Sequence, residues 1–239
     1  MTTIQLPTAT VSGVVDLVDA DAYDFYRHIH KGIRHALFHT TLRAGSLDVA
    51  DTDAVDAFLD AQRSLLGLLH SHHHHEDLHI QPMLEEHASE LALTIAAQHG
   101  DVEVGMACLE QRGQRLATVA RPGRAAAAHN LYLDLGRLTS AYLAHQLVEE
   151  TQVMPALRAV MPTEELVDVD LAIRGSLPPE EMAAVMTHML PAMDVEERTE
   201  MLGGMAMAPP PVFALFRAAA QAALPADQWA QVAQRIGIS

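Results

Sequence analysis

SHHHHEDLHIQPMLEEHASEL, residues 71–91, combines six histidines with acidic residues and contains no glycine. Successive residues of a helix are about 100° apart, so His72 and Glu76 lie on one face. An imidazole and a carboxylate placed in this way can bind the same ion. The histidine run is internal, which is not typical of a purification tag. The stretch therefore predicts a metal site on a helix.

Two further pairs have the same four-residue spacing. One is His99 with Glu103, and the other is His145 with Glu149, which Glu150 follows directly. Residues four apart lie on the same helical face. Three such pairs predict a shared metal centre, provided that their helices are neighbours and that the pairs lie at the same height.

Helical periodicity extends through four long segments that end at turn signals. Thr52 or Asp53 is expected to be the N-cap of the second segment. Alanine, leucine and glutamate dominate, and no alternation of β-branched residues indicates a strand. Short connections make neighbouring helices antiparallel. The prediction is an all-α fold, an up-down-up-down four-helix bundle, with helices at about residues 19–43, 52–86, 90–120 and 124–160.

The distances along the chain place the three pairs at one level of this bundle. About ten residues separate Glu76 from the turn near residues 86–90, and about ten separate that turn from His99. About 23 residues lead from His99 to the turn at residues 122–123, and about 22 lead from there to His145. Antiparallel helices with equal rise per residue therefore bring the pairs together.

The first segment is expected to add a ligand at the same level. His30 borders the apolar face that Ile33 and Leu37 define, and this position favours His30 as the ligand. A rival stripe of histidines lies on another face of the same segment, at His28, His35 and His39.

The chain is expected to divide into a metal-binding bundle, residues 1–162, and a smaller helical C-terminal cap or extension, residues 163–239. Asp194 followed by Glu197 resembles a helix start. Methionines recur in this second part, and such a stripe is more typical of core packing than of a binding surface. Prolines separate helical patches at residues 180–190, 195–207, 212–223 and 226–236.

Composition excludes several classes of partner. The 239 residues include 15 Lys and Arg against 31 Asp and Glu, a net charge of −16 that repels nucleic acids and anionic lipids. Cys108 is the only cysteine, which excludes a cysteine-built metal cage. No apolar run approaches the roughly 20 residues that span a bilayer, and the N-terminus has no basic segment. We expect a soluble cytoplasmic protein whose partners are metal ions and small molecules.

Four motifs within about residues 19–161 resemble the haemerythrin-like, or HHE cation-binding, family. They are His30-x-x-Ile33-Arg34, HHHHEDLHIQP (72–82), QHGDVE (98–103) and HQLVEETQVMP (145–155). The resemblance implies a four-helix bundle that holds a non-haem di-iron centre. Carried over residue by residue, it implies the ligands His30, His72, Glu76, His99, His145 and one of Glu149 or Glu150.

The chain departs from oxygen-carrying haemerythrins at two positions. Those proteins have two histidines four apart on the third helix, where this chain has His99 and Glu103. Their last carboxylate lies five residues after its histidine, which selects Glu150, whereas a straight helix selects Glu149. If both Glu103 and Glu149 bind, hard carboxylate oxygens favour ferric iron. O₂ activation, peroxide disposal or ferrous iron oxidation is then expected in place of reversible O₂ carriage.

Other interpretations of the centre and its function remain open. Zinc also accepts histidine and carboxylate ligands, but six or seven donors exceed the needs of one tetrahedral zinc and favour two iron ions. The protein is expected to react with O₂, peroxide or a related small oxidant. The alternatives are a non-catalytic module that senses iron or oxygen, and a di-iron oxygenase that acts on a small organic substrate beneath the C-terminal part.

Overall fold

The computed structural model describes residues 17–19 and 22–238, and the regular secondary structure in this part of the chain is all helical, without a strand. The expected all-α fold is confirmed for these residues. The N-terminal segment expected to lack a basic region lies outside them, as do residues 1–16 of the first predicted unit.

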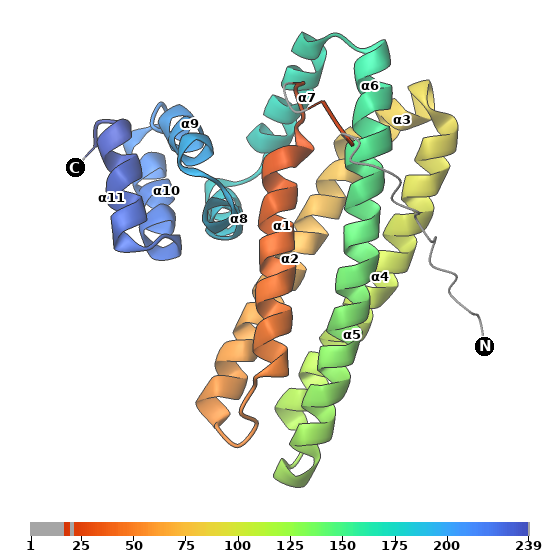
Figure 1. Ribbon diagram of the computed structural model, residues 1–239, viewed down its shortest axis with the longest axis vertical. Coiled ribbons are helices and arrows are strands. Elements are labelled where there is room, and N and C mark those ends of the chain that lie inside the picture. Colours follow the sequence, from red (N-terminus) through yellow and green to blue (C-terminus); the bar gives the residue numbers. More distant parts are fainter. Residues whose placement is uncertain (1–16, 20–21, 239) are drawn as a thin grey trace.

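Four long helices lie side by side and form the body of the molecule (Figure 1). α4 packs against α5, α1 packs against both α5 and α2, and α2 packs against α4. Their bounds are Tyr26–Gly45 for α1, Thr52–His79 for α2, Ser89–Thr118 for α4 and Arg121–Val148 for α5.

The predicted helix ends differ from the observed ones in detail. The first helix begins at Tyr26, not near residue 19. The N-cap of α2 is Asp51, whose carboxylate accepts the backbone N–H groups of Asp53 and Ala54, so the choice of Thr52 or Asp53 was wrong by one position or two. A carboxylate is a strong cap because it satisfies N–H groups that have no partner within the helix.

Two prolines interrupt segments that the sequence predicts as continuous helices. The segment at residues 52–86 is divided at Ile80 into α2 and the short α3, Gln81–His87, in which Pro82 occupies the first turn. The segment at residues 124–160 contains a π-helical turn, η1, Glu149–Val153, before α6, Met154–Val160. Proline lacks an N–H and its ring clashes with the carbonyl four residues earlier, so it disrupts the regular hydrogen bonding of an α-helix.

The C-terminal part, residues 163–239, is called the tail below. Its first helix, α7, Thr163–Ser176, was not among the predicted patches. The other four coincide closely with them, and the capping box of Asp194 and Glu197 is present at the start of α9. These helices are α8, Pro179–Ala192, α9, Val195–Met205, α10, Pro210–Ala223, and α11, Ala226–Arg235.

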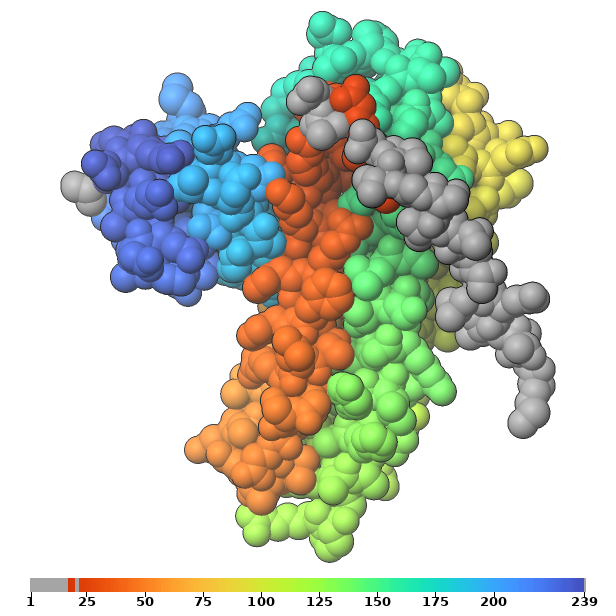
Figure 2. Space-filling view, in the orientation of Figure 1, coloured from red at the N-terminus to blue at the C-terminus, as the bar shows by residue number. Residues whose placement is uncertain are grey.

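The tail lies along the side of the bundle, not only over its end. α8 packs against α1 and α10, and Figure 2 shows the tail beside α1. The contact is close, because a Cβ on Gly32 would lie 2.9 Å from Cγ and 3.0 Å from Cα of Met189. None of the described helices is long and apolar enough to cross a membrane.

The buried apolar side chains form two clusters. One cluster surrounds the end where α3, α6 and α7 meet and includes Leu84, Ile95 and Leu157. The other fills the bundle towards the α4–α5 turn and continues under the tail. The candidate metal centre consists of polar residues on the four long helices and η1.

Candidate metal centre

Two groups of buried donor side chains lie within the bundle. In each group the donor atoms are all within 4.8 Å of one another. Glu76 of α2 belongs to both groups, so the groups are adjacent. The first group is His30 of α1, His72 and Glu76 of α2, and Glu149 of η1; the second is His73 and Glu76 of α2, His99 of α4 and His145 of α5.

The carboxylate of Glu76 extends to both groups. Its Oε1 lies 3.1 Å from Nε2 of His72, and its Oε2 lies 3.3 Å from Nε2 of His99. One oxygen therefore faces a histidine of the first group and the other faces a histidine of the second. This is the arrangement required of a carboxylate that bridges two metal ions.

Glu149 extends to both groups in the same way. Its Oε2 lies 3.3 Å from Nε2 of His30, and its Oε1 lies 3.3 Å from Nε2 of His145. The π-helical turn begins at this residue, where the N–H of Met154 bonds to the carbonyl of Glu149. π-Helical turns of this kind are frequent at functional sites.

The donor atoms of the two groups have no hydrogen-bond partner among the described residues, although they are buried. A buried polar atom without a partner costs roughly 1–3 kcal/mol, more if it is charged, and native proteins contain few of them. A metal ion would satisfy many of these lone pairs at once, so the side chains fit such a ligand. The atoms are Nε2 of His30, His72, His99 and His145, both ring nitrogens of His73, and both carboxylate oxygens of Glu76 and Glu149.

Three of the histidines are oriented by their other ring nitrogen. Each Nδ1 contacts an oxygen that accepts a hydrogen bond, so Nδ1 bears the proton and Nε2 is left as the donor to a metal. The contacts are His30 to Glu150 at 2.9 Å, His99 to Asp77 at 2.8 Å and His145 to Gln98 at 3.0 Å.

Burial keeps the imidazoles of His72, His73 and His145 neutral, as metal ligands must be. It lowers the pKa of His73 to about 4 and that of His145 to about 3. It also lowers the pKa of His72 well below the ordinary value. In all three, burial outweighs the attraction of the Glu76 carboxylate.

Without a metal, two of the histidines stay protonated, because neighbouring carboxylates stabilise the positive charge. Burial disfavours a charged His30 or His99, but the adjoining carboxylates outweigh it and raise the pKa of each to about 9. Burial and the neighbouring Glu76 raise the pKa of Glu149. Metal binding must therefore displace protons from the centre.

Two buried tyrosines pack against the histidines. The Tyr26 ring stacks on His30 with ring centres 4.7 Å apart, and the Tyr142 ring stacks on His73 at 5.3 Å. The hydroxyl of Tyr142 is buried without a hydrogen-bond partner among the described residues. These rings restrict the orientation of the imidazoles.

The structure brings together most of the predicted ligands and leaves two of them outside the donor groups. Glu103, which the spacing predicts as a ligand, is instead exposed on α4 and lies outside both groups. The buried side of α4 runs from His99 through Val102 to Met106, in alternating steps of three and four residues, and Glu103 falls outside it. Glu150 also lies outside both groups, and the choice between the two adjacent acids falls on Glu149. The residues brought together are His30, His72, Glu76, His99, His145 and Glu149.

His73 is the donor that sequence reasoning missed. At about 100° per residue, Glu76 lies about 40° from His72 and about 60° from His73 around the helix, so it is flanked by both. The spacing of three residues between His73 and Glu76 was therefore a usable signal. A rule that pairs only residues four apart does not find it.

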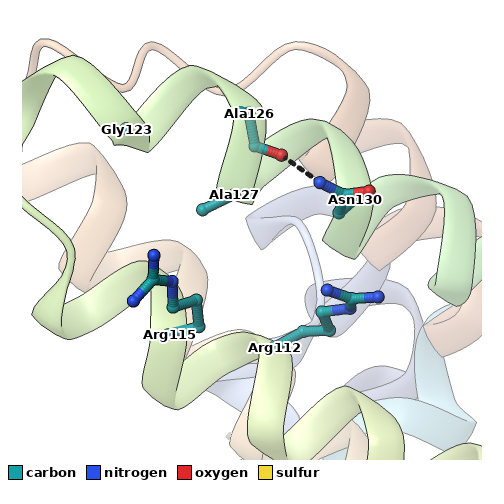
Figure 3. A pocket seen from close by; sticks show the side chains of 6 residues that line it. All are labelled: Arg112, Arg115, Gly123, Ala126, Ala127 and Asn130. Atoms are coloured by element: carbon teal, nitrogen blue, oxygen red, sulfur yellow. Dashed lines mark hydrogen bonds between the residues drawn. The ribbon is translucent and has the colours of Figure 1, made fainter.

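A pocket lies elsewhere in the bundle, near the α4–α5 turn. It has a volume of about 200 Å³ and is lined by Arg112, Arg115, Gly123, Ala126, Ala127 and Asn130. Figure 3 shows the two arginines on one side, and Asn130 donating a hydrogen bond of 2.8 Å to the carbonyl of Ala126 on the other. Arg112 is 13 residues from His99 along α4, or about 20 Å, so this pocket does not adjoin the candidate centre.

Comparison with protein-family models, with curated proteins and with solved structures gives no match for this chain. The assignment of the centre therefore depends on the donor atoms themselves, on their burial and on their missing hydrogen bonds.

Proposed function

We propose that this protein is an up-down-up-down four-helix bundle of the haemerythrin type that holds two non-haem iron ions and reacts with O₂ or peroxide. The main support is the pair of adjacent donor groups joined by Glu76 and Glu149, whose buried oxygens have no hydrogen-bond partner in the described part of the chain. Five histidines and two carboxylates exceed the four ligands of one tetrahedral zinc. Carboxylates shared between facing helices are typical of di-iron bundles.

The two ion positions differ in their donors. The second group contains three histidines, His73, His99 and His145, whereas the first contains two, His30 and His72. With Glu76 and Glu149 both extending to the two positions, the first would have four protein ligands and the second five, so the first has more room for a small molecule. We therefore assign the reaction with the oxidant to the His30 and His72 position. There, iron would supply the electrons that O₂ or peroxide accepts.

Burial favours a small oxidant over an organic substrate. None of the seven donor residues is more than 9% exposed. A diatomic molecule or peroxide can reach such a centre through small fluctuations of the packing, whereas an oxygenase substrate would need a cavity of about 300 Å³ or more. The oxygenase alternative is therefore the less favoured one.

A second candidate function is reversible binding of O₂, either for sensing or for storage. Glu103 was the reason to expect irreversible oxidation, and Glu103 lies outside the centre. His73 instead supplies a fifth imidazole. A histidine-rich donor set favours ferrous iron more than a carboxylate-rich one does, which removes the argument against a reversible complex.

The direct test is metal analysis of protein purified without oxygen, with optical spectra before and after exposure to air. We expect about two irons per chain. A single zinc with no iron would contradict the proposal. If removing O₂ restores the initial spectrum, the protein binds O₂ reversibly; if the iron stays oxidised while O₂ or peroxide is consumed, it is an oxidoreductase.

A matched pair of variants tests the assignment of the second group. His73→Ala should weaken binding of one iron, because His73 is buried beside Glu76, His99 and His145. His74→Ala should leave both irons in place, because His74 is exposed on the same helix. Equal iron content in the two variants would remove His73 from the ligand set.

A further inference from the structure

The two ring nitrogens of His30 lie close to the carboxylates of two consecutive residues. Its Nδ1 lies 2.9 Å from Oε1 of Glu150, and its Nε2 lies 3.3 Å from Oε2 of Glu149. The imidazole is 0% exposed, so water cannot replace either contact. The hydrogen bond of Nδ1 to Glu150 leaves Nε2 as the ring nitrogen that faces Glu149 and the donor group.

Glu149 and Glu150 differ in their hydrogen-bond partners. Arg34 donates from Nη1 to Oε1 of Glu150 at 2.6 Å and from Nη2 to Oε2 at 2.8 Å. Both oxygens of Glu150 are thus engaged by a guanidinium, which binds a carboxylate in a fixed plane. Both oxygens of Glu149, by contrast, have no hydrogen-bond partner in the described chain. Glu149 is free to bind metal and Glu150 is not.

The π-helical turn explains how neighbouring residues face the same helix. In an α-helix successive side chains diverge by about 100°, and the wider π turn reduces this angle. η1 begins at Glu149, and Pro155 follows it without an N–H to offer to Thr151. Glu149 and Glu150 can therefore both face His30 of α1.

Asp77 contacts a histidine of the other donor group in the same way. Its Oδ1 lies 2.8 Å from Nδ1 of His99. Its side chain is 54% exposed, whereas that of Glu150 is 19% exposed and bound by Arg34. Each ion position thus has one histidine supported by a carboxylate. The support at His30 is the more rigid of the two.

We propose that Glu150, held by Arg34, is a positioning residue for the metal at the His30 and His72 position. It keeps the proton of His30 on Nδ1, so that Nε2 is available to the metal, and it holds η1 so that Glu149 faces the two groups. This inference rests on the proposed two-metal function. It assigns Glu150 a role outside the ligand set.

The test is a titration of the metal-free protein with Co²⁺, whose visible spectrum reports the ligands. The wild type should bind two ions. In Glu150→Gln one of the two sites should weaken by about 10–100-fold and the other should change little, since loss of such a partner has effects of this size. Arg34→Met should weaken the same site by a smaller factor, because Glu150 keeps its contact with His30.

Asp77→Asn is the matched control, because it should weaken the other site and leave the Glu150-dependent one unchanged. The His30→Ala background separates positioning from a general structural effect. If Glu150 acts through His30, Glu150→Gln should add little loss of Co²⁺ affinity to that of His30→Ala. An effect on folding alone would instead lower the unfolding temperature of the metal-free protein and add fully in the double variant.

Three outcomes would overturn the inference. Unchanged Co²⁺ affinity at both sites in Glu150→Gln would show that Glu150 has no role at the centre. A complete loss of one ion in Glu150→Gln, with a mild effect of Glu149→Gln, would make Glu150 the ligand. Fewer than two ions in the wild type would refute the proposed function itself, and the inference with it.

Discussion

The same four helices contain two layers of opposite character. The polar layer consists of the seven donor residues of the metal centre, whose ten buried donor atoms have no hydrogen-bond partner in the described chain. The apolar layer, towards the α4–α5 turn, is made of fully buried side chains such as Phe58, Leu65, Leu109, Leu116 and Leu131. The apolar layer stabilises the fold by itself, whereas the polar layer needs a ligand to offset its desolvation.

The difference shows that buried apolar residues repeated at helical spacing specify the fold. Buried polar residues that interrupt this apolar pattern specify the site. Burying a leucine-sized side chain contributes roughly 1.5–3 kcal/mol, whereas an unpartnered buried polar atom costs roughly 1–3 kcal/mol. A layer with ten such atoms is tolerable without metal only because the apolar layer and the second apolar cluster hold the same helices together.

The largest expected effect is that of Glu76→Ala on metal content. Glu76 has one oxygen beside each donor group, so its removal should abolish binding of both ions. Glu103→Ala is the matched control and should retain both, because Glu103 is exposed. Iron analysis of the two variants checks the prediction. Retention of one tightly bound ion in Glu76→Ala would show that Glu76 does not bridge.

Leu109→Ala should have the opposite pattern of effects. Leu109 is 0% exposed in the apolar layer, and such truncations cost about 2–5 kcal/mol because a cavity remains. Urea unfolding should show this loss while the folded variant still binds two metal ions. If metal binding fell in proportion to stability, the two layers would not be independent.

The sequence predicted the helices and most of the residues that lie in the two donor groups, because both depend on periodicity. Residues four apart on one face paired His72 with Glu76 and His145 with Glu149, and all four lie in the two buried donor groups. The same rule failed at Glu103, because the buried stripe of α4 passes from His99 to Val102 by a step of three. A spacing rule cannot tell which of the two steps a buried stripe takes.

The remaining differences come from local backbone chemistry. Pro82 ends α2 early and starts α3, and the turn before Pro155 widens into η1. The sequence shows both prolines, but whether a helix breaks, bends or widens at a proline depends on the packing of its neighbours. Neither the hydrogen bonds of Glu150 nor the position of the tail beside α1 could be inferred from spacing.

The third prediction concerns pH, which should affect the stability of the metal-free protein and its affinity for metal in opposite directions. His30 and His99 have pKa values raised to about 9, against about 6.5 in the unfolded chain. Their protonation stabilises the metal-free fold fully below pH 6.5, and this contribution is lost as pH rises to 9. Metal affinity should change in the opposite direction, rising up to tenfold per pH unit for each proton displaced.

Urea unfolding of metal-free protein and Co²⁺ titration at pH 7, 8 and 9 measure the two trends. On the acid side, His73 and His145 resist protonation in the folded state, with pKa values of about 4 and 3. The unfolded chain takes up protons first, so stability should also fall as pH decreases below 6.5. A metal affinity independent of pH between 7 and 9 would show that the centre holds no displaceable protons.

The smallest effect on stability is expected on the outer face of α1, where the helix packs closely against α8 and no metal ligand is involved. A methyl group at Gly32 would lie 2.9–3.0 Å from side-chain and backbone atoms of Met189, and such overpacking costs about 1–3 kcal/mol. Alanine regains about 1 kcal/mol of helix propensity, so Gly32→Ala should destabilise the protein by about 1 kcal/mol net. Gly67→Ala, at an exposed position of α2 with no atom within 4 Å, should stabilise it by a similar amount.

Both variants should keep two metal ions, because the contact with α8 lies outside the polar layer. Loss of an ion in Gly32→Ala alone would mean that the tail helps to hold His30 in place, and that the polar layer extends to the surface between α1 and α8.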